Sequence, residues 1–241
     1  ETVGVHETRA GFVVPDATRT ALHELTPATL RFNERVLHWR ATAGSVEVTT
    51  TAGVYKAGQL VITAGPWVRE FVPALPVQVE RKILFWFEPT CGLEAFALGK
   101  FPVWGWELPD GTYIYGFPAT DGPTGGVKVA VHREVPAVNC TADTIDRVVH
   151  PDEIVAMRQQ LSTHVPALAG KCLATKTCLY TNAPDGHFLL DRHPHHRQVL
   201  IVSPCSGHGF KFVPVIGEIV ADLVTTNSTR HDIRLFRLDR F

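Results

Sequence analysis

The chain has 241 residues, 45% hydrophobic and 20% charged, with a formal net charge of -1, so it can bury one large core or two smaller ones and offers no basic surface for nucleic acid. No apolar run reaches the length of a membrane span, and the polar residues from Glu1 onward do not resemble a signal peptide. An odd count of cysteines without metal-type pairs favours free thiols in a reducing cytoplasm; they are Cys91, Cys140, Cys172, Cys178 and Cys205.

The first part of the chain mixes extended and helical patterns. We expect two short extended pieces, Thr2–Val5 and Ala10–Val14. Asp16 then predicts the cap of a helix over 17–25 that ends before Pro27, and residues 28–32 predict a strand.

A meander of short strands follows. It comprises residues 36–40, 46–51 and 54–56, separated by Ala-Gly turns. A fully apolar strand over 59–63 then enters the turn Ala64-Gly65-Pro66-Trp67 and a short helix over 68–71.

From Pro76 the pattern changes to alternating, aromatic-rich runs separated by Pro-Asp-Gly or Gly-Gly turns. The runs are residues 77–80, 82–87, 103–107, 113–117 and 127–131. They predict an antiparallel sheet of about six strands between Pro76 and Val131, with one face packed and the other lining a site. One or two helices are expected between Thr144 and Ala167, starting at Pro151 and ending at Pro166.

The last third begins with predicted strands over 172–180 and 188–191. The turn His193-Pro194-His195-His196 suggests a metal, but no acidic or cysteine ligand lies at a matching offset, so we expect no metal site.

A strand, a glycine-bearing turn and a helix close the pattern. The strand covers 199–202, the turn reads Ser206-Gly207-His208-Gly209-Phe210-Lys211-Phe212, and apolar positions then recur at helical spacing from Val215 to Leu223. A helix N-terminus offers unpaired N–H groups and positive potential, which suit an anionic ligand.

This turn, followed by Ile216-Gly217-Glu218-Ile219, closely resembles the C-terminal flavin-site segment of the monomeric sarcosine oxidase and N-methyltryptophan oxidase family. The resemblance implies oxidation of a small N-methyl or secondary amino acid with FAD and oxygen. It also implies an α+β fold, with an antiparallel-sheet substrate domain (76–171) packed on helices and an incomplete α/β FAD-binding layer (1–75 and 172–241).

The resemblance implies five catalytic or substrate-contacting residues. In this family the lysine matching Lys128 lies against the flavin and promotes the reaction with oxygen, as a fixed cation can. The others are Tyr115 in the substrate pocket, the active-site histidine His132, Lys211 facing the substrate carboxylate, and His208 in the turn. Lys128 lies within an apolar strand, so we expect a buried lysine there. The loop around Asp121-Gly122-Pro123 is about two residues longer than in close relatives of the family.

The resemblance also implies the cofactor contacts. Cys178 matches the cysteine joined to the flavin ring as a thioether, although a small buried thiol remains the alternative. Cys172 is the better candidate for a structural thiol. Val36 matches the edge of the adenine pocket, and Gly65 the closest approach to the pyrophosphate. The remaining cofactor positions are Thr63, Trp67, Gly207, Gly209 and Phe210.

One departure is large. The chain has no Gly-x-Gly-x-x-Gly unit and matches only the C-terminal two-thirds of the family. We therefore expect the chain alone to purify without stoichiometric flavin, and an exposed sheet edge to favour self-association or a partner chain. Three alternatives stay open for the function of the chain. It is a truncated oxidase with little or no activity, or an oxidase half completed by another chain. The third alternative is a domain without cofactor that acts as a hydrolase through Ser206 and His208 or as a binding module.

Overall fold

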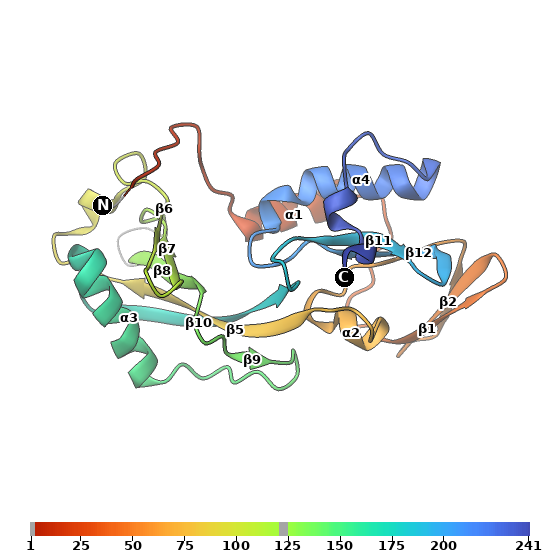
Figure 1. Cartoon of the computed structure of the whole chain (residues 1–241), viewed down its shortest axis with the longest axis horizontal. Helices are drawn as coiled ribbons and strands as arrows, with labels where there is room; N and C mark the ends of the chain where they lie inside the picture. The colour runs from red at the N-terminus through yellow and green to blue at the C-terminus, as the bar shows by residue number, and fades with distance from the viewer. Residues whose placement is uncertain (1–2, 121–124) are drawn as a thin grey trace. The chain divides into compact units, whose positions relative to one another are not determined.

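The computed structural model describes residues 3–120 and 125–241, so the loop around Asp121-Gly122-Pro123 lies outside the described residues. The chain divides into two compact units (Figure 1). Unit 1 comprises Glu1–Phe12 and Glu80–Leu179, and unit 2 comprises Val13–Val79 and Tyr180–Phe241. The sequence predicted domain boundaries at residues 75/76 and 171/172, which lie before the observed boundaries at 79/80 and 179/180. It also predicted residues 1–12 to belong with the FAD-binding layer, whereas they belong to unit 1.

Unit 1 is built on a six-stranded sheet with the order β10-β5-β8-β7-β6 and β9 paired to β5. The strands are β5 (Gln78–Phe87), β6 (Trp104–Glu107), β7 (Tyr113–Gly116), β8 (Val127–Arg133), β9 (Asn139–Cys140) and β10 (Cys172–Asn182). The pairs β5–β8, β8–β7 and β7–β6 are antiparallel, as the alternating sequence predicts. The α+β fold with an antiparallel sheet is therefore confirmed.

One face of this sheet is packed against the helix α3 (Pro151–His164). Successive strand side chains point to opposite faces, so every second residue enters the core. The buried cluster includes Phe85, Phe87, Ile114, Val127 and Val129 from the strands and Met157 and Leu161 from α3. The opposite face of the sheet is left to carry other side chains.

Unit 2 contains two three-stranded sheets. The meander is antiparallel and consists of β1 (Val36–Thr42), β2 (Ser45–Thr50) and β3 (Val54–Ala57). The second sheet has the order β11-β12-β4, from β11 (Leu189–His193), β12 (His196–Ser203) and β4 (Leu60–Ile62). In it β12 is antiparallel to β11 and parallel to β4. The helices are α1 (Pro15–Leu25), α2 (Val68–Phe71) and α4 (Val213–Thr226).

Strand β12 is buried on both faces and joins two cores. Val199 and Ile201 pack with residues of β2 and α2, whereas Leu200 and Val202 pack with residues of α4. All four side chains are at most 2% exposed. Because burying such a side chain is worth about 1.5–3 kcal/mol, this strand anchors the turn that follows it.

Strand β4 lies at the edge of its sheet and pairs only with β12 among the described strands. An edge strand presents unpaired N–H and C=O groups to any additional strand. The open sheet edge predicted from the sequence is therefore present, while association through it remains a prediction.

Helix α1 is present and ends at Leu25 as predicted, but its predicted N-cap is wrong, and the predicted strand over 28–32 is absent. Helix α1 begins at Pro15 with Val14 as its N-cap, and Asp16 lies inside its first turn. Proline at the first helical position explains this start, because its fixed φ suits the helix and its missing N–H is not needed there. Residues 28–32 form no strand, since no described strand pairs with them.

The predicted sheet between Pro76 and Val131 is also incomplete. Residues 77–80 and 82–87, predicted as two runs, form the single strand β5 (Gln78–Phe87). Strands β9 and β10, both later in the chain, complete the six. No helix in the described part of the chain is long and apolar enough to cross a membrane.

Candidate functional site

Three predicted site residues lie together on the face of the unit 1 sheet that α3 does not cover. Lys128 and His132 are four residues apart on β8, so they point to the same side. Tyr115 on β7 is paired with Ala130, which lies between them on that side. All three side chains are half-buried. The structure thus gathers Lys128, His132 and Tyr115 on one face of the unit 1 sheet.

The ammonium of Lys128 lies among aromatic rings. Its Nζ is 5.2 Å from the centroid of Phe117 and 5.8 Å from that of Trp86, the residue paired with it across β5 and β8. Such rings stabilise a cation through the negative face of their π system. Lys128 is only half-buried, so the sequence prediction of a buried lysine at this position is wrong.

The buried lysine of unit 1 is Lys82, which is 1% exposed. Its Nζ lies 3.1 Å from a carboxylate oxygen of Glu80 and 3.1 Å from one of Glu134. Two carboxylates offset the cost of burying the charge. Lys82 was not predicted to be buried, although it also lies in an apolar strand.

His132 contacts two tyrosines. Its ring meets Tyr113 edge-on at 5.8 Å and Tyr115 edge-on at 6.4 Å between centroids. Tyr113 covers Gly105, where an added Cβ would lie 1.8 Å from the tyrosine hydroxyl oxygen. Tyr113 was not among the predicted site residues. Tyr113 lies two residues before Tyr115, so strand alternation could have indicated that both tyrosines belong to the site. In the structure, a register shift between Tyr113 and Ile114 interrupts the pairing of β7 with β8.

Cys178 lies on β10 in unit 1 and is partly buried. Burial raises the pKa of its thiol above the ordinary value, and the charges of Lys128, Lys82 and Lys176 oppose that rise. A thiolate needs a cationic environment, which these lysines supply in part. The pKa of Cys172 is also raised, mainly by burial, and this thiol packs beside the apolar core as predicted.

In unit 2 the turn after β12 is held by Ser206, which has a φ of 49°. Its N–H donates to Thr181 O, and its hydroxyl donates to His187 O at 3.0 Å and accepts from the Ala183 N–H at 3.2 Å. Gly209 has no room for a side chain, because an added Cβ would lie 1.5 Å from Pro204 O. The residues 206–212, which include Gly207, Gly209 and Phe210, are called the site turn below.

The two charged groups of the site turn are fixed by backbone oxygens. His208 Nε2 lies 3.1 Å from Gly186 O, so this nitrogen carries a hydrogen. Lys211 Nζ donates to His208 O at 2.9 Å and is exposed at the entrance to α4. The Ser206 hydroxyl and the His208 ring thus bond to backbone groups rather than to each other, which gives a serine hydrolase no support.

Two of the predicted cofactor residues, Val36 and Thr63, line a groove of unit 2. This groove of about 230 Å³ is lined by Val36, Thr63, Trp39, Phe71 and neighbouring residues of β2 and β4. Gly65 follows Thr63 and Ala64 in the chain and has a φ of 52°, a backbone angle that residues with a side chain rarely adopt. Trp67 is 39% exposed in the short helical turn Gly65–Trp67.

The histidine turn between β11 and β12 forms an aromatic cluster. His193 and His196 lie 5.4 and 5.6 Å from Trp39, both edge-on. Burial, with smaller contributions from His196 and His195, lowers the pKa of His193. No group of three metal-ligating side chains occurs within residues 3–120 and 125–241.

Comparison with known proteins identifies the family. The FAD dependent oxidoreductase family matches residues 2–223. A monomeric sarcosine oxidase of Streptomyces avermitilis is 43% identical over 240 residues, covering 97% of this chain and 62% of that protein. The N-methyl-L-tryptophan oxidase of Salmonella typhimurium is 32% identical over 242 residues, covering 99% of this chain and 63% of that protein.

Solved structures share the fold. NikD, an amino acid oxidase essential for nikkomycin biosynthesis, superposes with a TM-score of 0.72 at 24% identity, over 92% of this chain and 58% of NikD. Glycine oxidase from Geobacillus kaustophilus gives a TM-score of 0.65 at 21% identity, over 86% of this chain and 52% of that chain.

The chain spans about three fifths of the length of the curated relatives it matches. The Gly-x-Gly-x-x-Gly unit is not within these 241 residues. The match nevertheless runs through both compact units, from the first residues to the helix after the site turn. This chain belongs to the FAD dependent oxidoreductase family.

Proposed function

We propose that this chain is the substrate-side part and half of the flavin-binding part of an oxidase that acts on a small N-methyl or secondary amino acid. The observation that carries the proposal is the gathering of Lys128, His132 and Tyr115 on one face of the unit 1 sheet. The relatives named sarcosine oxidase and N-methyl-L-tryptophan oxidase support this substrate class. In this proposal unit 1 is the substrate domain, and unit 2 belongs to the FAD-binding domain.

FAD is the cofactor of the family, and the described residues fit part of it. The groove beside Val36 and Thr63 is apolar enough for an adenine edge. The site turn brings backbone close to a ligand without side chains at Gly207 and Gly209, and helix α4 begins directly after it. Burial raises the pKa of the Cys178 thiol, and the charges of Lys128, Lys82 and Lys176 act against that rise. The pyrophosphate-binding unit would have to come from outside these residues.

The chemistry divides between two cations. Bound FAD would supply two-electron transfer from the amine to dioxygen. The amine loses two electrons and two protons and becomes an imine. Dioxygen gains two electrons and two protons and becomes hydrogen peroxide. Lys211 binds the substrate carboxylate, and Lys128 stabilises the negative charge that develops on oxygen.

His132 has a positioning role in this scheme. Its ring packs edge-on against Tyr113 and Tyr115, which orients the imidazole on this face of the sheet. Tyr115 then forms one wall of the substrate pocket.

The edge strand β4 provides a place where the sheet of unit 2 can be extended by a further strand. A parallel strand could add beside Leu60–Ile62, which already pairs in parallel with β12. That strand would come from a partner chain, a second copy, or a nucleotide-binding region on the same polypeptide.

The test joins the nucleotide-binding region of the Streptomyces avermitilis relative to the first residue of this chain. We expect the protein to carry flavin, and sarcosine or N-methyl-L-tryptophan to reduce it without oxygen. The flavin should stay attached after denaturation, and Cys178→Ser should release it, whereas Cys172→Ser should not. A folded, flavin-bearing protein that neither amino acid reduces would refute the substrate class.

A further inference from the structure

The segment of residues 234–240 in unit 2 is tied to a turn by one arginine. Arg240 donates from Nε to one carboxylate oxygen of Asp185 at 2.7 Å and from a terminal nitrogen to the other at 3.1 Å. It also donates to Phe188 O at 3.0 Å and to Arg237 O at 2.7 Å. The Arg240 side chain is only 15% exposed. Such a bidentate pair fixes direction as well as distance.

The turn that Arg240 holds also carries the site turn. Asp185 accepts the His187 N–H at 3.1 Å, which closes the turn 183–187. The carbonyl oxygens of Gly186 and His187 in this turn bond to His208 Nε2 and to the Ser206 hydroxyl. Arg240 thus bonds to Asp185 and Phe188, and the site turn bonds to Gly186 and His187, which lie between them in the chain.

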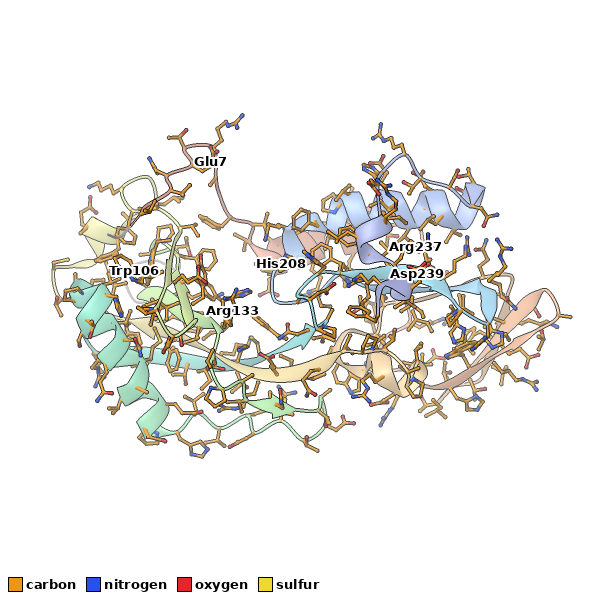
Figure 2. The ribbon with its side chains drawn as sticks, in the orientation of Figure 1. Glu7, Trp106, Arg133, His208, Arg237 and Asp239 are labelled. Atoms are coloured by element: carbon orange, nitrogen blue, oxygen red, sulfur yellow. The ribbon has the colours of Figure 1, made fainter. Side chains whose placement is uncertain are left out.

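Aromatic packing follows the same route. The ring of Phe188 lies 4.8 Å from that of His208 and 5.4 Å from that of Phe212. It also lies 5.3 Å from Phe236 of the 234–240 segment. Phe188 is 4% exposed, so this stack is a packed core contact. Figure 2 labels His208 of the site turn and Arg237 and Asp239 of the segment.

We propose that the 234–240 segment is a clasp that positions the site turn, with Arg240 and Asp185 as its positioning residues. The clasp holds the 183–187 turn, which orients His208 through Gly186 O. His208 in turn offers its own carbonyl oxygen to Lys211. The consequence for substrate binding rests on the proposed function, because it depends on Lys211 facing the substrate carboxylate.

Amide hydrogen exchange of this chain, resolved by peptide, tests the clasp. Asp185→Asn and Arg240→Lys each weaken the bidentate pair, and exchange at residues 206–212 should rise about tenfold, as expected for losing one charge-assisted hydrogen bond. The matched control is Glu47→Gln. Glu47 accepts two hydrogen bonds from Arg40 in the β1–β2 meander of unit 2, outside the 183–187 turn and the 234–240 segment. Its loss should leave the site turn unchanged.

The outcomes separate cleanly. Faster exchange confined to residues 183–188 and 206–212 in the first two variants supports the clasp. Unchanged exchange there, or an equal rise across unit 2 in all three variants, overturns it. In the completed, flavin-bearing protein, Asp185→Asn should raise KM for the amino acid about tenfold and keep kcat within about twofold. Faster exchange with an unchanged KM would contradict the role of Lys211 and leave the clasp standing.

Discussion

Lys128 is the residue whose charge matters most in the proposed chemistry. Replacing it by methionine keeps an unbranched side chain beside Trp86 and Phe117 but removes the cation. In the protein completed with a nucleotide-binding region, we expect Lys128→Met to slow the reaction of reduced flavin with oxygen about a hundredfold. The reason is that the positive charge of Lys128 acts on oxygen in the proposed chemistry. Reduction by substrate should change far less.

Stopped-flow measurement of the two half-reactions checks this expectation. Lys100→Met is the control, since Lys100 is an exposed lysine of unit 1 that pairs with Glu94. Equal slowing of both half-reactions by Lys128→Met would argue against a role on oxygen.

Asp185 gives a pH-dependent contribution to stability. The hydrogen bond from Arg240 is the main cause that lowers the pKa of Asp185 from 3.8 to about 2. Since the folded pKa lies below the unfolded one, the stabilisation is complete above pH 3.8 and is lost as pH falls to about 2. The loss should be about 1 kcal/mol, because solvent screens a pair whose carboxylate is partly exposed.

Unfolding free energies measured across that pH range for the chain and for Asp185→Asn test this sign. The variant should be less stable above pH 3.8, and the two curves should converge towards pH 2. A difference that stays constant with pH would contradict the assignment.

Single residues also mark the limit of sequence reasoning. A lysine in an apolar strand predicts a buried charge, and two such lysines, Lys82 and Lys128, stand in neighbouring strands. Lys82 is paired with Glu80, two residues away, and with Glu134, which lies 52 residues away. The partnership with Glu134 could not be predicted from the local pattern.

At the scale of elements, β12 is the strand on which unit 2 depends. Ile201 is fully buried and packs on the cluster formed with β2 and α2. Ile201→Ala should lower the free energy of unfolding by about 2–5 kcal/mol, through lost burial and the cavity left behind. Val54→Ala on β3 is the control, because Val54 is 64% exposed and should change stability by less than about 0.5 kcal/mol. Equal losses in chemical denaturation would show that β12 does not anchor the unit.

The element predictions succeeded where a local signal was strong. The strand, glycine turn and helix around the site turn were predicted because burial, glycines and helical spacing agree over a short stretch. The pairing of β10 with β5 joins residues far apart in the chain, and no local pattern reports such a partner. The N-cap of α1 was wrong for a local reason, since Pro15 competes with Asp16 for the helix start.

At the scale of the whole molecule, the family and the fold class were predictable from one short motif and one change of pattern, and both are confirmed. The roles of the candidate site residues remain predictions. The chain covers 62% of the sarcosine oxidase relative. We expect the chain alone to purify with less than stoichiometric flavin.

Under the proposed function, this chain supplies the face of a flavin oxidase at which the amine is oxidised and oxygen is reduced. The most direct test measures oxygen uptake and peroxide release together in the completed protein supplied with an N-methyl amino acid. We expect one peroxide formed for each oxygen and each amine consumed, with activity lost in Lys211→Met through a raised KM. A flavin-bearing protein that consumes no oxygen with any N-methyl or secondary amino acid would contradict the proposed function.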